Sequence, residues 1–376
     1  KKKSDILNIL TLGGSTTWGA RLKQRELAYP HILAKMSNGK YIVTNKAMRA
    51  TDAHYPSLCI QSMLMDTNDY EFDVIILEFS LNGVSGIDTL VKRLQYRFPN
   101  AIFIYVHLYS LANVILDNSG SKNAREYHIQ ERNSVQWHWD PDPRKTAVAQ
   151  GIEDFFKKIK GYVYSLPKPK ISPHEAMPYF AVDWLHLSEK GHVQVAQDLL
   201  DLISRAQFDT SVDVIPDLFD IKWGHGDTCE NWFETGQTTV KNDGGSMQPL
   251  FTGEAYNQNK FSMEFKFHTN PEQNGGTIVI MNNHATKIPL FITYLSAPHI
   301  YPTTDIIVEN TVTEINPDRE FYHVAVTTQI GFAEPGFNNI RILPHYQSDA
   351  PFRLVGVVLY GFHYHRNVPL RSAHNH

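Results

Sequence analysis

The sequence predicts an α/β domain built on a parallel sheet, followed by a domain of antiparallel strands. Over the first 209 residues, short apolar segments alternate with segments of helical periodicity, a pattern typical of a parallel sheet with helices on both faces. Beyond residue 209 the helical periodicity stops, and short alternating segments are separated by Gly, Pro and Asn, as in a β-sandwich or jelly roll. A chain of 376 residues suits two domains. We expect a three-layer α/β domain over residues 1–209, a β-sandwich over 210–368 and a tail over 369–376.

The elements of the first domain follow from its apolar periodicity. Strands are expected at Ile6–Leu12, Lys40–Thr44, Val74–Phe79, Ala101–His107 and Gly161–Ser165. Helices are expected near Gln24–Met36, Tyr55–Asp66, Ile87–Phe98, Thr146–Lys160 and Ser188–Ala206. The last of these helices has a one-sided apolar stripe, and Ser188 stands where its N-cap would be. In the second domain, strands are expected at Phe261–Phe267, Thr277–Met281, Leu290–Leu295, Ile306–Glu309, His323–Thr328, Asn339–Leu343 and Leu354–His363.

Composition and charge narrow the class of partner. Hydrophobic residues make up 42 % of the chain, which is ample for buried cores. The formal net charge of −4 gives no electrostatic case for binding nucleic acid or an anionic membrane surface. No apolar stretch reaches the roughly 18 to 20 residues of a membrane-spanning helix. We expect no nucleic-acid partner and no transmembrane segment, and favour the extracellular space or the secretory lumen over the cytoplasm.

Ser15 is a candidate nucleophile at the end of the first strand. It follows Gly13 and Gly14 and opens a helical segment, so its hydroxyl is held out on a tight turn beside unpaired N–H groups of a helix start. Near the end of the same domain, Asp183 and His186 are three residues apart and face the same way in a turn. A serine nucleophile needs such a base, and the base needs a carboxylate that fixes its tautomer. Taken singly, each motif is also common in ordinary turns.

Asn82 is the candidate hydrogen-bond donor for the developing oxyanion. It follows the buried-type strand Val74–Phe79, and the carboxyl end of such a strand is where an open α/β sheet presents a donor. Acyl transfer needs hydrogen-bond donors aimed at the developing oxyanion, and a side-chain amide supplies one. By itself the pair Asn82-Gly83 is more often a turn.

Together these segments resemble the SGNH (GDSL-type) hydrolase family over roughly residues 5 to 205. The resemblance implies a flavodoxin-like fold, with Ser15 as nucleophile, His186 as base and Asp183 as its orienting acid. It places the oxyanion hole at the backbone N–H groups of Ser15 and Ala50 and at the side chain of Asn82. Ala50 stands where the family usually has glycine, and Gly-Gly-Ser replaces Gly-Asp-Ser in the first motif. No metal or organic cofactor is implied.

The resemblance favours a serine esterase acting on small acyl esters, with an O-acetyl group on a glycan as a candidate substrate. An O-acyltransferase to a sugar hydroxyl and a non-catalytic glycan-binding protein are the alternatives. The polar, aromatic segment Asp117–Arg144 is interpreted as a flap beside the site or, equally, as a hydrophobic plug under a loop. The candidate substrate-binding side chains are Trp18, Trp137, Trp139 and Trp184.

The two cysteines exclude a disulfide framework and a cysteine-rich zinc site. Cys59 falls in an apolar helical pattern, where a buried free thiol is expected, and a bridge to Cys229 is the alternative. The groups His225/Asp227/Cys229/Glu230 and His363/His365 have no recognised ligand spacing and are interpreted as ordinary polar residues.

Overall fold

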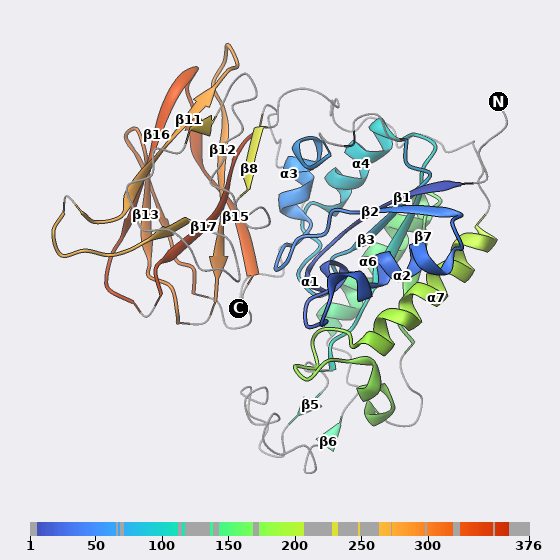
Figure 1. Ribbon diagram of the computed structural model, residues 1–376. Helices are drawn as coiled ribbons and strands as arrows, with labels where there is room; N and C mark the ends of the chain where they lie inside the picture. The colour runs from blue at the N-terminus through green and yellow to red at the C-terminus, as the bar shows by residue number, and fades with distance from the viewer. Residues whose placement is uncertain are drawn as a thin grey trace.

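The computed structural model describes most of the α/β part and the greater share of the β part (Figure 1). The described residues are 6–64, 67, 71–111, 115–116, 136–137, 143–167, 173–206, 228–231, 247–248, 263–271, 273–297, 299–318, 324–348 and 350–360. The expected boundary at residue 209 and the expected tail lie outside these residues. Among the described residues, no helix is both long and apolar enough to span a membrane.

The N-terminal part is built on a five-stranded parallel sheet, as predicted. Its strands lie in the order β2-β1-β3-β4-β7, and each neighbouring pair is parallel. Their bounds are β1 Leu7–Gly13, β2 Tyr41–Asn45, β3 Val74–Glu78, β4 Ile102–His107 and β7 Tyr162–Ser165. Every residue of β3 is buried because this strand lies at the centre and is covered on both faces.

Helices cover the two faces of this sheet and give it three layers. Helices α3 (His54–Met63), α4 (Ile87–Arg97) and α6 (Pro143–Lys158) cover one face, and α2 (Tyr29–Met36) and α7 (Glu189–Arg205) cover the other. Ser188 caps α7 as predicted, accepting a hydrogen bond from the N–H of Gly191 at 3.3 Å. Shorter helical segments are α1 (Ser15–Trp18), η1 (Arg25–Leu27) and η4 (Pro173–Tyr179).

The helix expected over Gln24–Met36 is in fact two segments. The 3-10 turn η1 ends at Ala28, whose ψ of 147° is extended, and α2 begins at Tyr29. Pro30 lies in the first turn of α2 and has no N–H to bond back into η1, so a helix can begin there but cannot run through.

The C-terminal part is a sandwich of two antiparallel sheets, as expected. One sheet has the order β10-β17-β12-β15, with β8 also pairing with β17, and the other has the order β14-β13-β16-β11-β9. The bounds are β8 Thr228–Asn231, β9 Met247–Gln248, β10 Met263–Phe265, β11 Gly276–Asn282, β12 Ile288–Ser296, β13 Thr304–Val308, β14 Thr311–Ile315, β15 Val324–Ala333, β16 Gly336–Pro344 and β17 Phe352–Leu359. One buried cluster joins the facing sides of both sheets. In the small antiparallel pair β5 (Ile115–Leu116) and β6 (Gln136–Trp137), β5 directly precedes the segment interpreted as a flap and β6 lies within it.

A disulfide joins the two parts of the chain, so the expectation of a free thiol at Cys59 is wrong. Cys59 is fully buried in α3, and its sulfur is bonded to that of Cys229 in β8 across a Cα–Cα distance of 5.8 Å. Figure 1 shows α3 and β8 side by side between the sheet of the α/β part and the sandwich. Helical periodicity correctly predicted that Cys59 is buried. It could not indicate the partner, because Cys229 in β8 lies 170 residues away in sequence.

Candidate active site

The predicted site residues meet at the carboxyl edge of the parallel sheet. Ser15 opens α1 directly after β1, and Asn82 lies in the turn that follows β3, the neighbour of β1 in the sheet. His186 lies in the loop that precedes α7. Because parallel strands all end at this edge, residues far apart in sequence come together there.

Ser15, His186 and Asp183 form a connected hydrogen-bonded chain. The Oγ of Ser15 lies 2.8 Å from Nε2 of His186, and Nδ1 of His186 lies 2.8 Å from Oδ2 of Asp183. The other carboxylate oxygen of Asp183 accepts the backbone N–H groups of Leu185 and His186, each at 3.1 Å. With its Nδ1–H held by the carboxylate, the imidazole turns a proton-accepting Nε2 towards the serine.

The environment keeps Asp183 ionised. Burial alone raises the pKa of its carboxyl, but the hydrogen bonds and charge of His186 and the backbone N–H groups outweigh burial. The net result is a pKa well below the usual range of an aspartate. Asp183 therefore stays negatively charged and can hold the Nδ1–H of His186.

The turn that brings Asp183 and His186 together is anchored by Trp184. Trp184 has a left-handed backbone with a φ of 54°, and its side chain is 7 % exposed within the core cluster beneath α7. Its carbonyl accepts a hydrogen bond from Oγ of Ser110 at 3.2 Å. This packing holds the residue between the acid and the base, and leaves little of the indole open to a ligand.

Asn82 lies against the turn that carries the nucleophile. A Cβ on Gly14 would stand 2.3 Å from Nδ2 of Asn82, so no residue larger than glycine fits there with the amide in place. The same Nδ2 donates to the carbonyl of Thr51 at 3.0 Å, and a primary amide has a second N–H. The contacts of Asn82 with Gly14 and Thr51 thus bring three segments together beside Ser15: the turn after β1, the loop of Ala50 and the turn after β3.

Ala50 adopts a backbone conformation that alanine disfavours. Its φ is 62°, in the left-handed region that costs an L-residue about 1–2 kcal/mol. The residue is buried, and its carbonyl accepts a hydrogen bond from the N–H of Ala325 in β15 at 2.7 Å. The loop predicted to supply an oxyanion donor is therefore in contact with the β-sandwich, which the sequence did not indicate.

Glu78 is a buried carboxyl beneath the nucleophile turn that the sequence analysis did not single out. Its side chain accepts hydrogen bonds from Thr17 and from Ser80, each at 3.1 Å, and its carbonyl accepts the N–H of Gly14. Burial raises its pKa to about 7, and the hydrogen bonds only partly oppose that effect. A glutamate inside the otherwise apolar strand β3 was the signal that could have found it.

Arg21 is a second residue that the sequence analysis missed. Its Nε donates at 2.8 Å to Oδ2 of Asp183, the oxygen that also receives His186, while its own side chain is 59 % exposed. Such an exposed ion pair contributes little to stability. Its position places a guanidinium at the solvent side of the Asp183 carboxylate, and nothing in its sequence context indicated that.

Of the remaining candidate tryptophans, only Trp18 has its side chain among the described residues. Two guanidinium groups lie near the indole ring of Trp18, that of Arg25 at 5.0 Å and that of Arg49 at 4.4 Å from the ring centroid. The backbone of Trp137 belongs to β6, but its side chain and the whole of Trp139 lie outside the described residues. A contact of these two rings with a sugar stays a prediction.

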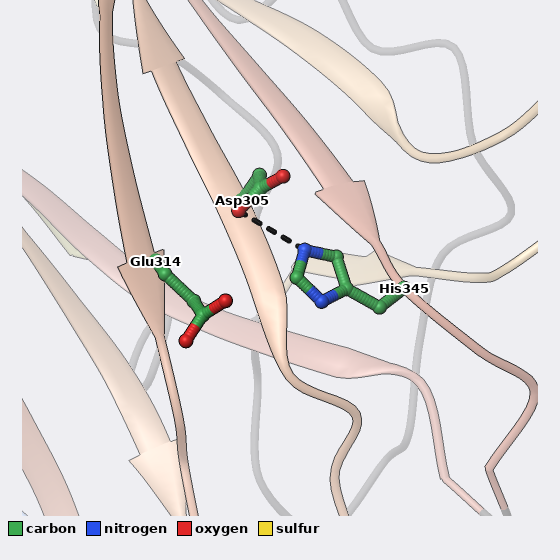
Figure 2. A group of neighbouring side chains, drawn as sticks. All are labelled: Asp305, Glu314 and His345. Atoms are coloured by element: carbon green, nitrogen blue, oxygen red, sulfur yellow. Dashed lines mark ion pairs between the residues drawn. The ribbon is translucent and has the colours of Figure 1, made fainter.

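Three side chains of the β-sandwich have the donor types of a metal site (Figure 2). Asp305 of β13 faces Glu314 of β14 across the strands, and His345 follows β16. Their ligand atoms lie within 4.8 Å of one another, and Nε2 of His345 is 3.0 Å from Oδ1 of Asp305. All three are at least partly exposed. The imidazole of His345 lies within hydrogen-bonding distance of one of the two facing carboxylates, so this contact accounts for the arrangement without a metal ion. Of the residues interpreted as ordinary polar groups, Cys229 is in the disulfide, and His225, Asp227, His363 and His365 lie outside the described residues.

The raised pKa of Glu78 predicts a pH-dependent stability. The group is protonated in the folded state up to about pH 7 but ionises near pH 4.5 when unfolded, so the free energy of unfolding falls as pH rises between these values. Glu78→Gln should remove that fall, which is about 2–4 kcal/mol. Urea unfolding of both proteins at pH 5, 6, 7 and 8 checks the difference in slope. Glu71→Gln, at an exposed carboxylate, is the control and should keep the wild-type slope. Parallel slopes for wild type and Glu78→Gln would contradict the assignment.

Comparison with known proteins supports the fold. No family model matches the sequence, and no curated protein does. A solved two-domain esterase active on acetylated mannans, co-crystallised with mannopentaose, is 16 % identical; the match covers 96 % of this chain and 92 % of the other with a TM-score of 0.55. A G-D-S-L family lipolytic protein from Veillonella parvula is 12 % identical over 53 % of this chain and 99 % of its own, with a TM-score of 0.37. A family two carbohydrate esterase from Clostridium thermocellum in complex with cellohexaose is 14 % identical over 53 % of this chain and 64 % of its own, also with a TM-score of 0.37.

The first of these likenesses spans both the parallel sheet and the β-sandwich, so it covers the whole two-part architecture. The chain has the fold of that two-domain esterase: an SGNH-like three-layer α/β part on a parallel sheet, followed by an antiparallel β-sandwich.

Proposed function

We propose that this protein is a serine esterase that hydrolyses small acyl esters through an acyl-enzyme on Ser15. The observation that carries the proposal is the position of His186, whose two ring nitrogens lie 2.8 Å from Ser15 Oγ and 2.8 Å from Asp183 Oδ2. A base placed between a serine and an ionised carboxylate is the arrangement that nucleophilic acyl transfer requires.

In the proposed reaction, Ser15 Oγ attacks the acyl carbonyl while Nε2 of His186 takes its proton. The negative charge that develops on the carbonyl oxygen is stabilised by the N–H groups of Ser15 and Ala50 and by the amide of Asn82. The tetrahedral intermediate collapses, and His186 returns the proton to the leaving alcohol. Water then attacks the acyl-enzyme with His186 again as base, which releases the carboxylic acid and regenerates the serine. Asp183 orients the imidazole and stabilises its charged form throughout.

The favoured substrate is an O-acetyl group on a glycan. The two-domain esterase that shares this architecture acts on acetylated mannans and was crystallised with mannopentaose. The disulfide suits an oxidising compartment, such as the one in which secreted enzymes that act on glycans are found. An organophosphonate that labels activated serines tests the chemistry: mass spectrometry should find the adduct on Ser15, and Ser15→Ala should not be labelled.

The nucleophile and its base should act as a unit. Ser15→Ala and His186→Ala should each lower kcat for an activated acetyl ester by about 10⁴-fold or more, and the double variant should lose little beyond that. Circular dichroism and a melting curve serve as the control for folding. Substantial turnover by well-folded Ser15→Ala would rule out the mechanism.

Loss of the Asn82 amide should slow the chemical step. Asn82→Ala should lower kcat by about 100- to 1000-fold with a smaller change in KM, because the donor acts mainly on the charge of the transition state. Ser85→Ala is the matched control, because Ser85 is an exposed residue in the same loop between β3 and α4, and it should keep the wild-type kcat. A rise in KM with unchanged kcat would mean that Asn82 only binds the substrate.

Partitioning of the acyl-enzyme separates a hydrolase from the acyltransferase alternative. A hydrolase needs a positioned water, whereas a transferase must bind an acceptor hydroxyl and exclude water. We expect an activated acetyl ester to be hydrolysed without acceptor, and added oligosaccharides to divert a minor share of acetyl groups into acetylated sugar, measured by mass spectrometry. If deacylation stalls until a sugar is added and acetylated sugar becomes the main product, the transferase is the correct function. A non-catalytic glycan-binding protein would leave the ester intact in both arms.

A further inference from the structure

Ala50 has a left-handed backbone conformation that glycine adopts readily and alanine does not. Its φ of 62° lies in the region where glycine is favoured, and the motif to which it belongs usually has glycine there. An alanine released from its surroundings would relax to a negative φ and turn its N–H away from the direction that the left-handed conformation gives it. Something outside the loop must therefore hold it.

The edge of the β-sandwich supplies that constraint. Strand β15 is the last strand of its sheet, and its open edge is occupied by residues 50 to 54 of the α/β part. The N–H of Ala325 donates to the carbonyl of Ala50 at 2.7 Å, and Thr51 pairs with Ala325 as a parallel bridge. The imidazole of His54 hydrogen-bonds to the backbone of Thr327, two residues further along the same edge.

Side-chain packing acts on the same residue. The methyl group of Ala50 lies in a small buried cluster that is otherwise formed by the β part, in which Leu295, Ala297, Tyr301, Ala325 and Val355 are each at most 4 % exposed. On its other side the loop is tied to the catalytic turn, because Asn82 Nδ2 donates to the carbonyl of Thr51. Any movement of the loop at residue 50 is thus transmitted to both the Ala50 N–H and the Asn82 amide.

We infer that β15 is a positioning element of the active site: its edge holds the loop of Ala50 in the left-handed conformation that aims the oxyanion donors. The inference rests on the proposed function. It gives the β-sandwich a role in the chemical step that is separate from any binding of substrate. Ala325 touches no reacting atom and acts through Ala50 alone, so it is a positioning residue.

Ala325→Pro removes the contact with least damage to the sheet. The N–H of Ala325 points out of the edge towards Ala50, so its loss breaks no hydrogen bond between β15 and β12, and proline is tolerated on edge strands. We expect kcat for an activated acetyl ester to fall about 5- to 30-fold, the population shift that matches the intrinsic cost of the left-handed conformation. KM should stay within twofold, because the ground-state contacts are unchanged. Gln329→Pro, on the same edge of β15 but beyond the loop contact, is the matched control and should keep the wild-type kcat.

Rescue by glycine distinguishes positioning from general damage. Glycine adopts a φ near 62° without penalty, so in an Ala50→Gly background Ala325→Pro should cost less than twofold in kcat, against the 5- to 30-fold loss expected with Ala50 in place. A merely destabilised protein would lose further activity when glycine is introduced. If Ala325→Pro does not fold, Ala325→Leu, which overfills the cluster shared with Ala50 but keeps the N–H, should show the same loss in kcat at constant KM.

Amide hydrogen exchange measures, without any substrate, how firmly the loop of Ala50 is held. Exchange at residues 50 to 52 should be faster in Ala325→Pro than in wild type, and unchanged in Gln329→Pro. Unaltered exchange and kcat in Ala325→Pro, or an equal loss in Gln329→Pro, would overturn the positioning role and leave the esterase intact. A wild-type protein that turns over no ester and is not labelled at Ser15 would instead overturn the proposed function, while the exchange experiment would still decide whether β15 restrains the loop.

Discussion

The arrangement of the site depends on one close approach, that of the Asn82 amide to the backbone of Gly14. The amide occupies the space in which a Cβ of residue 14 would stand. That approach is possible because β1 and β3 are direct neighbours, with Gly13 opposite Glu78, so the turns that follow them leave the sheet side by side. Ser15, the loop that contains Thr51 and the Asn82 amide are therefore held close together where these two turns leave the sheet.

Two carboxyl groups near the nucleophile are held in opposite states by their surroundings. Asp183 is surrounded by donors, two of them backbone N–H groups and one the imidazole, and stays charged. Glu78 lies fully buried with two hydroxyl donors, and burial favours its neutral form until about pH 7. In the proposed reaction, a negative charge beneath Ser15 would oppose the charge that develops on the oxyanion, whereas a neutral acid there does not. At mildly acidic pH, the separation of the two pKa values thus leaves the charge on the triad carboxylate and keeps it off Glu78.

Local patterns in the sequence predicted most of the α/β part and singled out the residues of the Ser15–His186–Asp183 hydrogen-bonded chain, whose catalytic roles stay a prediction. Strands such as β3 and helices such as α7 carry their own periodicity, and the order of the motifs along the chain identified Ser15, Asp183 and His186 as candidates. Two failures were local: the helix expected over Gln24–Met36 was continued through Pro30, and β14, whose residues are mostly exposed, shows no regular alternation. The other failures arose from contacts between distant segments. Three contacts that no local pattern predicted each join segments more than 160 residues apart. They are the disulfide of Cys59, the ion pair of Arg21 with Asp183 and the hydrogen bond of Ala325 with Ala50.

The open edge of β15 also bears on how freely the two parts could be exchanged in evolution. An unpaired edge strand presents a row of N–H and C=O groups that invites another chain to pair with it. Here residues 50 to 54 cover part of that edge. A β-sandwich transferred to another protein without this loop would carry an uncovered edge and a tendency to self-associate. The sandwich is therefore not an interchangeable appendage, and inheritance of the two parts together is what the architecture favours.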